Sequence, residues 1–204
     1  MADYPILKNS PLYIQESLLF PYSQGTIFFD AVFKKMGKDA FSAVFKDPPV
    51  DSSQIIHPDK YFNHEKPAKP DLPKISSDMK IKEVTEGTMG EFDHSILLRQ
   101  YLGEVKAAQI SGHLAGGQFK IVNIGKLKHP ILIYASQWDS NSSAASYFAA
   151  YKKVLHSKWK HLDETSSTTD MLKGTADNGY FETRLTGDRV TSVEGMSSPV
   201  TITY

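Results

Sequence analysis

The hydrophobic pattern of the first 66 residues predicts a series of helices. Ser10 and Pro11 suit the N-cap and the first position of a helix, since proline needs no amide partner there. We expect Pro21 to break or restart this helix, because proline lacks an amide donor. Apolar residues then recur with a period near 3.6 up to a stop at Gly37. The residues predicted to share this apolar face are Tyr22, Phe29, Val32, Phe33 and Met36.

Shorter helices are expected to follow this long helical region. The first should carry Phe41, Val44 and Phe45 on its inward side. Residues 47–49, which include two prolines, end it, and one further helical turn is expected over residues 54–57.

A proline-rich stretch then interrupts the helical pattern. Three prolines within seven residues, Pro67, Pro70 and Pro73, favour an extended segment without regular hydrogen bonds. We therefore divide the chain into a helical segment (1–66), a proline-rich linker (67–77) and a second domain (78–204).

The second domain mixes the helical and the strand periods. We expect the chain to turn at Gly116–Gly117 and to form a polar loop over residues 163–178. The predicted order is strand, two helices, two strands, long helix and two strands, over residues 79–84, 92–102, 104–110, 119–124, 129–138, 140–162, 180–185 and 189–193. Because short hairpins favour antiparallel pairing, the pattern predicts the α+β class, with an antiparallel sheet and helices packed on one face.

Charge and cysteine content exclude several classes of function. The 23 Lys and Arg balance the 23 Asp and Glu, so no nucleic-acid or membrane-surface partner is expected to be held by bulk charge. The absence of cysteine excludes disulfides, thiolate zinc sites, iron–sulfur clusters and a cysteine nucleophile. No apolar run approaches the roughly 20 residues of a membrane span, and residues 1–11 lack a signal-peptide pattern. We expect a soluble protein, exported if a leader precedes residue 1.

The seven histidines form no zinc motif. The pattern His-Glu-x-x-His is absent. His156 and His161 would diverge by about 140° on a helix, so they are interpreted as surface residues. His57 and His64 leave a weak metal site open as an alternative, although their proline-bounded surroundings favour a structural role.

The chain also lacks the common nucleophile and phosphate-binding motifs. No Gly-x-Ser-x-Gly, Gly-x-Gly-x-x-Gly or Walker sequence occurs. We therefore assign no catalytic, cofactor-binding or metal-binding residue, and we expect no cofactor.

Two segments of the chain nevertheless form a recognisable pair. The sequence FPYSQGTIFF at residues 20–29 is followed by DPPVDSSQIIHPDKY at residues 47–61. This pair resembles a region of largely uncharacterised bacterial proteins related to the gluzincin-like zinc metallopeptidases. The sequence QWDS at residues 137–140, which precedes a helix rich in Ala and Phe, resembles the C-terminal Trp-Asp-Ser helix of the same family.

The resemblance implies that the catalytic part is missing from this chain. In the family, a His-Glu-x-x-His helix and a glutamate in a Glu-Gly-Asp-Ala-like motif hold the zinc, and both would lie before residue 1. Glu16 lies near the first motif, but the histidines that it would serve do not occur here. The remaining motif residues are given structural roles: Gly25 allows close helix packing, and Gln54 and His57 bond the loop backbone.

Two hypotheses for the function follow. In the first, the chain is a non-catalytic accessory or support region of a zinc-metallopeptidase-like protein, with its own upstream catalytic domain or a protein ligand as partner. It would then be part of an enzyme only if the full-length gene encodes that domain. In the second, it is a stand-alone α+β binding module for a protein or a small-molecule ligand.

Overall fold

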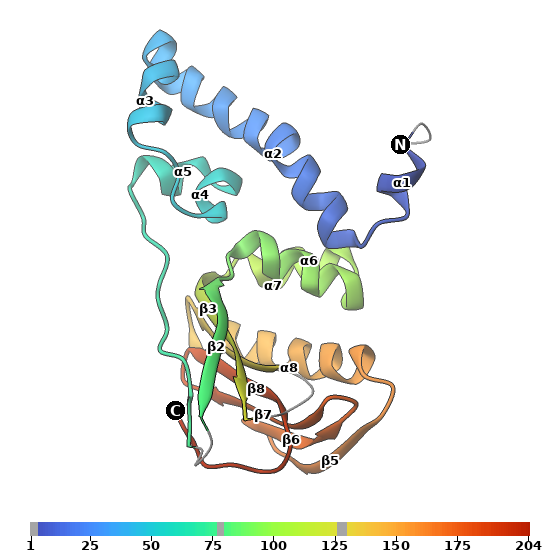
Figure 1. Ribbon diagram of the computed structural model, residues 1–204. Coiled ribbons are helices and arrows are strands. Elements are labelled where there is room, and N and C mark those ends of the chain that lie inside the picture. Colours follow the sequence, from blue (N-terminus) through green and yellow to red (C-terminus); the bar gives the residue numbers. More distant parts are fainter. Residues whose placement is uncertain (1–3, 77–79, 126–129) are drawn as a thin grey trace.

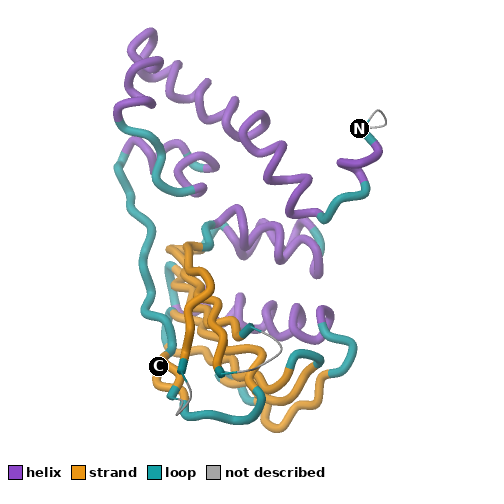
Figure 2. Tube along the Cα trace, viewed as in Figure 1, coloured by secondary structure: helices purple, strands orange, loops and turns teal. Residues whose placement is uncertain are grey.

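The chain folds into a helical arm and an α+β domain (Figure 1). The computed structural model describes residues 4–76, 80–125 and 130–204. The helices of the arm are shown in purple at the top of Figure 2, and an extended segment descends from them to the strands. The arm consists of α1 (Pro5–Lys8), α2 (Leu12–Met36), a 3-10 turn (Gly37–Asp39), α3 (Ala40–Lys46), α4 (Ser52–Ile56) and α5 (Pro58–Phe62).

Helix α2 continues through its proline. Pro21 lies inside a single 25-residue helix, so the predicted break at this position is wrong. The ring is on the exposed side of the helix, where the carbonyl group that it deprives of a helical donor can be solvated. The predicted stop is confirmed, because Gly37 caps the helix with a positive φ of 60°.

The arm has a small core of its own. Phe28, Val32, Ala40 and Tyr61 are buried together, and the Phe28 and Tyr61 rings meet edge-on with centroids 5.0 Å apart. Most of the other apolar side chains expected inside are exposed. The prediction that they are buried is wrong for Tyr22 (79% exposed), Phe33 (42%), Met36 (40%), Phe41 (58%) and Phe45 (88%). The helical period was present, but the arm has too few neighbouring elements to cover this much apolar surface.

A seven-stranded antiparallel sheet forms the centre of the α+β domain. Its strand order is β2-β3-β4-β8-β7-β6-β5. The strands are β2 (Ile81–Thr88), β3 (Leu114–Ile124), β4 (Ile131–Trp138), β5 (Leu162–Ser167), β6 (Met171–Ala176), β7 (Gly179–Thr186) and β8 (Arg189–Met196).

Helices pack against this sheet, which confirms the predicted α+β class. The helices are α6 (Glu91–Leu102), α7 (Glu104–Ser111) and α8 (Asn141–Lys158). The main core joins Leu98 of α6 and Phe148 of α8 to Trp138 and Phe181 of the sheet. In Figure 1 the helices α6 and α7 lie between the sheet and the arm, and α2 packs against α6.

The linker and the C-terminal segment contribute to a second core. Ile131, Ile133 and Val193 are buried there, and Leu72, Ile75 and Ile202 pack against the same cluster. The linker strand β1 (Lys74–Ile75) pairs with β9 (Ile202–Thr203) as a separate two-stranded sheet. The extended linker is therefore part of the packed structure of the domain.

Two predictions for the second domain are wrong. The chain does not turn at Gly116–Gly117, because both glycines lie inside strand β3. The supposed polar loop over residues 163–178 contains most of β5 and all of β6. Strand β5 is polar because it is an edge strand and most of its side chains are exposed on both faces.

The remaining elements of this domain agree with the predictions within a few residues. Helices α6 and α7, the long helix α8 and the hairpin of β7 and β8 are confirmed. Residues 79 and 129, where two strands were expected to begin, lie outside the described residues. Over the described ranges, none of the helices combines the length and the apolar character required to cross a membrane.

Candidate functional site

The arm carries most of the large apolar side chains that are exposed in the described part of the chain. Twelve of the sixteen large apolar side chains that are exposed in the described chain lie between residues 4 and 50. These residues are Tyr4, Ile6, Tyr13, Ile14, Leu18, Tyr22, Ile27, Phe33, Met36, Phe41, Phe45 and Val50. Single exposed apolar residues are ordinary, but a concentration of them marks an interaction surface.

Three of these side chains define a continuous row, which we call the apolar face of α2. Ile14, Leu18 and Tyr22 are four residues apart and are 45%, 56% and 79% exposed. Residues at this spacing lie one above the other on a helix. A second row of the same helix, Glu16, Phe20 and Gln24, lines a hollow towards α6. Each residue of this second row follows one residue of the apolar face by two positions. Two residues correspond to about 200° of rotation, so the apolar face points away from the domain.

A hollow of about 440 Å³ extends the apolar face towards α1. Tyr4, Ile6 and Leu7 line it from the α1 side, and Ile14 and Leu18 line it from α2. Helix α1 has no buried residue, so the structure leaves an apolar depression open at the end of the arm.

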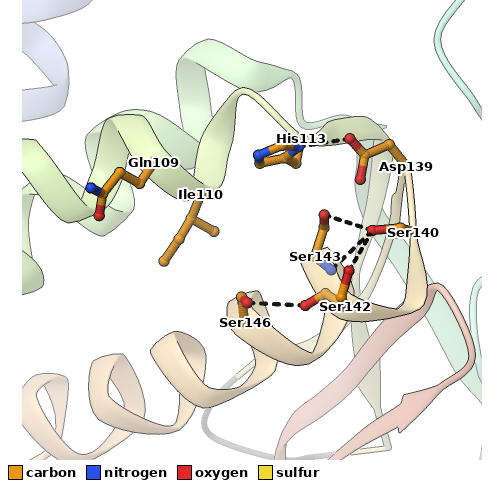
Figure 3. Close-up of a pocket in the computed structure, with 8 residues that line it drawn as sticks. All are labelled: Gln109, Ile110, His113, Asp139, Ser140, Ser142, Ser143 and Ser146. Atoms are coloured by element: carbon orange, nitrogen blue, oxygen red, sulfur yellow. Dashed lines mark hydrogen bonds and ion pairs between the residues drawn. The ribbon is translucent and has the colours of Figure 1, made fainter.

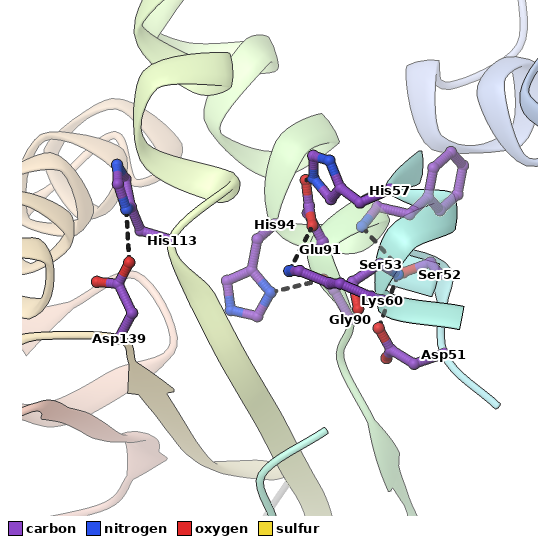
Figure 4. A network of polar contacts seen from close by, with 11 residues as sticks. Asp51, Ser52, Ser53, His57, Lys60, Gly90, Glu91, His94, His113 and Asp139 are labelled. Atoms are coloured by element: carbon purple, nitrogen blue, oxygen red, sulfur yellow. Dashed lines mark hydrogen bonds and ion pairs between the residues drawn. The ribbon is translucent and has the colours of Figure 1, made fainter. Parts of the chain in front are cut away.

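Polar contacts form one part of the junction between the arm and the domain (Figure 4). Glu91, the first residue of α6, has a side chain only 5% exposed. Its Oε1 atom lies 2.8 Å from Nε2 of His57, whose ring is 43% exposed. The Oε2 atom is buried without a hydrogen-bond partner among the described residues, and Lys60 Nζ lies 3.9 Å away. The imidazole of His57 is thus held by a buried carboxylate, which fixes Nε2 as its proton-bearing atom.

Side-chain hydrogen bonds at the start of α4 hold this helix at the junction. Asp51 is the N-cap of α4 and accepts a bond from the Ser53 amide at 2.7 Å. Ser52 accepts a bond from the Phe92 amide at 3.2 Å and so connects α4 to the first turn of α6. An acidic residue at the start of α6 also suits the positive end of the helix dipole.

A hollow of about 350 Å³ opens beside Glu91, between α2 and the pair α6 and α7. The Phe20 and Phe92 rings line it with their centroids 4.3 Å apart. Arg99 of α6 forms an ion pair with Glu16 of α2 at its margin. Glu16 thus connects the arm to the domain through this ion pair.

Buried polar groups form a second network below this junction. His94 Nδ1 lies 2.9 Å from the Gly90 carbonyl, which can only accept, so this nitrogen donates. In the neutral ring Nε2 then accepts from the Tyr134 hydroxyl at 2.6 Å, and Tyr134 accepts from Tyr147 at 2.9 Å. Burial lowers the pKa of His94, and the Gly90 bond opposes that effect. The sequence carries no local signal for these tyrosine partners of His94, which lie 40 residues or more along the chain.

A third polar group surrounds the start of α8 (Figure 3). His113 Nδ1 lies 2.7 Å from Asp139 Oδ2 beside a hollow of about 490 Å³. The Ser140 hydroxyl caps α8 by accepting from the Ser143 amide at 3.1 Å. Hydrogen bonds to Ser143 and His113 lower the pKa of Asp139.

This group has the residue types of a serine hydrolase without the required geometry. Such a site needs a serine hydroxyl bonded to the second histidine nitrogen. In the described chain, the hydrogen bonds of His113 include none to a serine. The hydroxyls of Ser140 and Ser143 bond each other at 2.8 Å, and Ser146 donates to the Ser142 carbonyl.

The histidines considered for metal binding are paired with separate carboxylates. His64 lies 3.2 Å from Asp47, whereas His57 bonds Glu91. His156 lies 2.8 Å from Glu164, and His161 lies 2.9 Å from Asp177. Among the residues that the structure describes, no group of three or more potential ligands is placed to hold a metal ion.

The structural roles expected for the motif residues have mixed outcomes. Gln54 is buried, accepts from the Val50 amide at 2.8 Å and donates to the Glu65 carbonyl at 2.7 Å, which confirms its bonding to loop backbone. His57 bonds a side chain of α6 instead. A side chain at Gly25 would approach only the Phe20 carbonyl of the same helix, at 3.9 Å, so the prediction of close packing there is wrong.

No protein-family model, curated protein or solved structure matches this chain.

Proposed function

We propose that this chain is the non-catalytic accessory region of a zinc-metallopeptidase-like protein, and that its arm docks on the catalytic domain. The observation that carries the proposal is the apolar face of α2 with the adjoining hollow. Ile14, Leu18 and Tyr22 remain exposed on the side of the helix that faces away from its own domain. A surface of this kind is stabilised when a protein partner covers it.

The motif residues support this assignment of the two sides of the arm. His57 and Gln54, from the second motif, bond inward to Glu91 and to the loop backbone. Tyr22, from the first motif, is directed outward and 79% exposed. The motifs thus shape the inner side of the arm and leave its outer side free for a partner.

Charge favours an apolar contact over an electrostatic one. Residues 4–50 contain five lysines, Lys8, Lys34, Lys35, Lys38 and Lys46, and four acidic residues, Glu16, Asp30, Asp39 and Asp47. Such a balance offers little long-range steering towards a charged partner. The occupant to which we commit is a folded catalytic domain with an uncharged apolar surface.

The first test is the genomic sequence before the codon of residue 1. We expect a continuous or adjacent reading frame that encodes His-Glu-x-x-His. That protein and this chain should co-elute in size-exclusion chromatography after co-expression. A locus without such a frame would contradict the proposal.

The second test compares substitutions in and outside the apolar face. The double variant Leu18→Glu/Tyr22→Glu should weaken the complex about tenfold or more, because a charge in an apolar interface has no partner. Val105→Glu is the matched control, since Val105 is an apolar residue of α7 that is 72% exposed. Equal binding of both variants would contradict docking through this face. Light scattering on the chain alone should show a monomer. A dimer that the double variant dissociates would mean that a second copy covers the face.

A further inference from the structure

We propose that the hollow between α2 and the pair α6 and α7 is a binding site for a small organic ammonium compound with an aromatic or branched apolar body. This site is distinct from the apolar face, which lies on the opposite side of α2. The hollow has a volume of about 350 Å³. That size is within the range of pockets that hold small ligands.

The walls of the hollow are suited to an apolar body. Phe20 of α2 and Phe92 of α6 form an aromatic wall from the two sides of the junction. Ile56, Ile96 and Ala107 add aliphatic surface. A flat or branched apolar group would therefore lose contact with water against residues of both arm and domain.

The charged groups of the hollow favour a cation. Three carboxylates, those of Glu16, Glu91 and Glu104, line it, and Arg99 is the single arginine or lysine among the lining residues. Arg99 is already paired with Glu16. Glu104 forms no ion pair with another described residue, so its charge is available to a ligand.

Glu91 adds a buried negative charge that is incompletely compensated. One oxygen bonds His57, and the other has no hydrogen-bond partner in the described chain, with Lys60 at 3.9 Å. A buried carboxylate in this condition attracts a positive group that is placed beside it in the hollow. Around the hollow, the three carboxylates thus outnumber the two basic groups of Arg99 and Lys60 by one.

The hydrogen bond to Glu91 also gives His57 a recognition role. Because its Nε2 proton points at Glu91, the Nδ1 atom of the neutral ring is an acceptor. His57 lines the hollow and is partly exposed. An ammonium group, which carries several donors, can use acceptors of this kind together with a carboxylate.

Phenethylamine is a suitable probe, because it combines an aromatic ring with one ammonium group. The experiment follows the methyl signals of alanine-labelled full chain by NMR during titration. We expect saturable shifts at Ala107 and Ala108, which line the hollow, with Ala176 of β6 unchanged. The neutral analogue 2-phenylethanol should bind about tenfold more weakly or less, since it lacks the charge.

Two variants identify the carboxylates. Glu104→Gln changes an exposed residue and should weaken phenethylamine binding about fivefold or more. Glu91→Gln should do the same, with its folding checked by the unchanged Ala176 signal. Glu65→Gln, an exposed glutamate that does not line the hollow, is the matched control and should bind like the wild type.

The proposal is overturned if the shifts do not saturate below about 10 mM. It is equally overturned if the alcohol binds as tightly as the amine, or if Glu104→Gln binds like the control. Because these measurements use the chain alone, they are independent of whether the apolar face docks on a catalytic domain.

Discussion

Gly116 offers a sharp test of how the linker is joined to the sheet. The chain crosses over strand β3 at this point, and the Ala68 amide bonds the Ala115 carbonyl at 2.8 Å. A methyl group added at Gly116 would overlap the backbone of Ala68. The glycine φ lies outside the left-handed region, so Gly116→Ala introduces a steric conflict without backbone strain of its own.

The expected magnitude follows from three contributions. Forcing an additional carbon into a packed contact costs about 1–3 kcal/mol. Loss of the Ala68–Ala115 hydrogen bond adds a net cost of about 1 kcal/mol. Alanine restricts the unfolded chain more than glycine does, which offsets roughly 0.4–1 kcal/mol of this cost. Gly116→Ala should therefore lower the free energy of unfolding by about 1–3 kcal/mol.

Gly25→Ala is the matched control for this substitution. Gly25 lies in the interior of α2, where an added methyl group meets only the Phe20 carbonyl at 3.9 Å. Alanine is favoured over glycine in a helix, so this variant should be more stable by about 0.5–1 kcal/mol. The same chemical change is thus expected to have opposite effects at the two positions.

Urea unfolding and amide exchange together provide the measurement. With a denaturant dependence of about 2 kcal/mol per molar, Gly116→Ala should shift the midpoint down by about 0.5–1.5 M. The Ala68 amide should exchange faster in that variant, because it loses its acceptor. If both variants shifted stability in the same direction, or if Ala68 exchange were unchanged in Gly116→Ala, the proposed contact between linker and sheet would be refuted.

Four further predictions concern the core and the junction. The free energy of unfolding should fall as the pH drops below about 6.5, because His94 binds a proton more readily in the unfolded state than in the buried site. The fall due to His94 is up to about 1.4 kcal/mol per pH unit. In urea titrations, the free energy of unfolding of His94→Gln should depend less steeply on pH. Leu98→Ala should cost about 2–5 kcal/mol in the same assay, since Leu98 is fully buried, and a cost below 1 kcal/mol would contradict its place in the core. Gln54→Ala should cost roughly 1–3 kcal/mol, because two backbone groups lose their partners; an unchanged urea midpoint would contradict these bonds. Elemental analysis should find no stoichiometric zinc in the purified chain, because His57 and His64 bond different carboxylates; one zinc per chain would contradict this expectation.

Local sequence patterns were sufficient for the elements whose signals are local. The Gly37 stop and the hairpin of β7 and β8 were predicted and are confirmed. Helix caps and tight turns depend on the conformational preferences of a few neighbouring residues. The α+β class follows in the same way from the order of these elements.

Elements that form only by pairing with another strand could not be predicted in this manner. Strand β5 is polar, and β6 has only two large apolar residues, Met171 and Leu172, which are adjacent, so neither has the apolar alternation that marks a strand. They form because β7 supplies a pairing partner for β6, and β6 supplies one for β5. The Pro21 prediction failed for a related reason, because the exposed side of α2 tolerates the lost hydrogen bond.

For the candidate sites, too, some features could be predicted from the sequence and others could not. The sequence determined which residue types were present, including the histidines, the paired glycines and the apolar period of α2. It could not determine that His57 meets Glu91, 34 residues away, or that Ala68 crosses over Gly116. It also could not show that Ile14, Leu18 and Tyr22 stay exposed, because periodicity identifies a face without identifying what covers it. Only the tertiary structure decides this, since burial and long-range hydrogen bonds depend on which segments pack together.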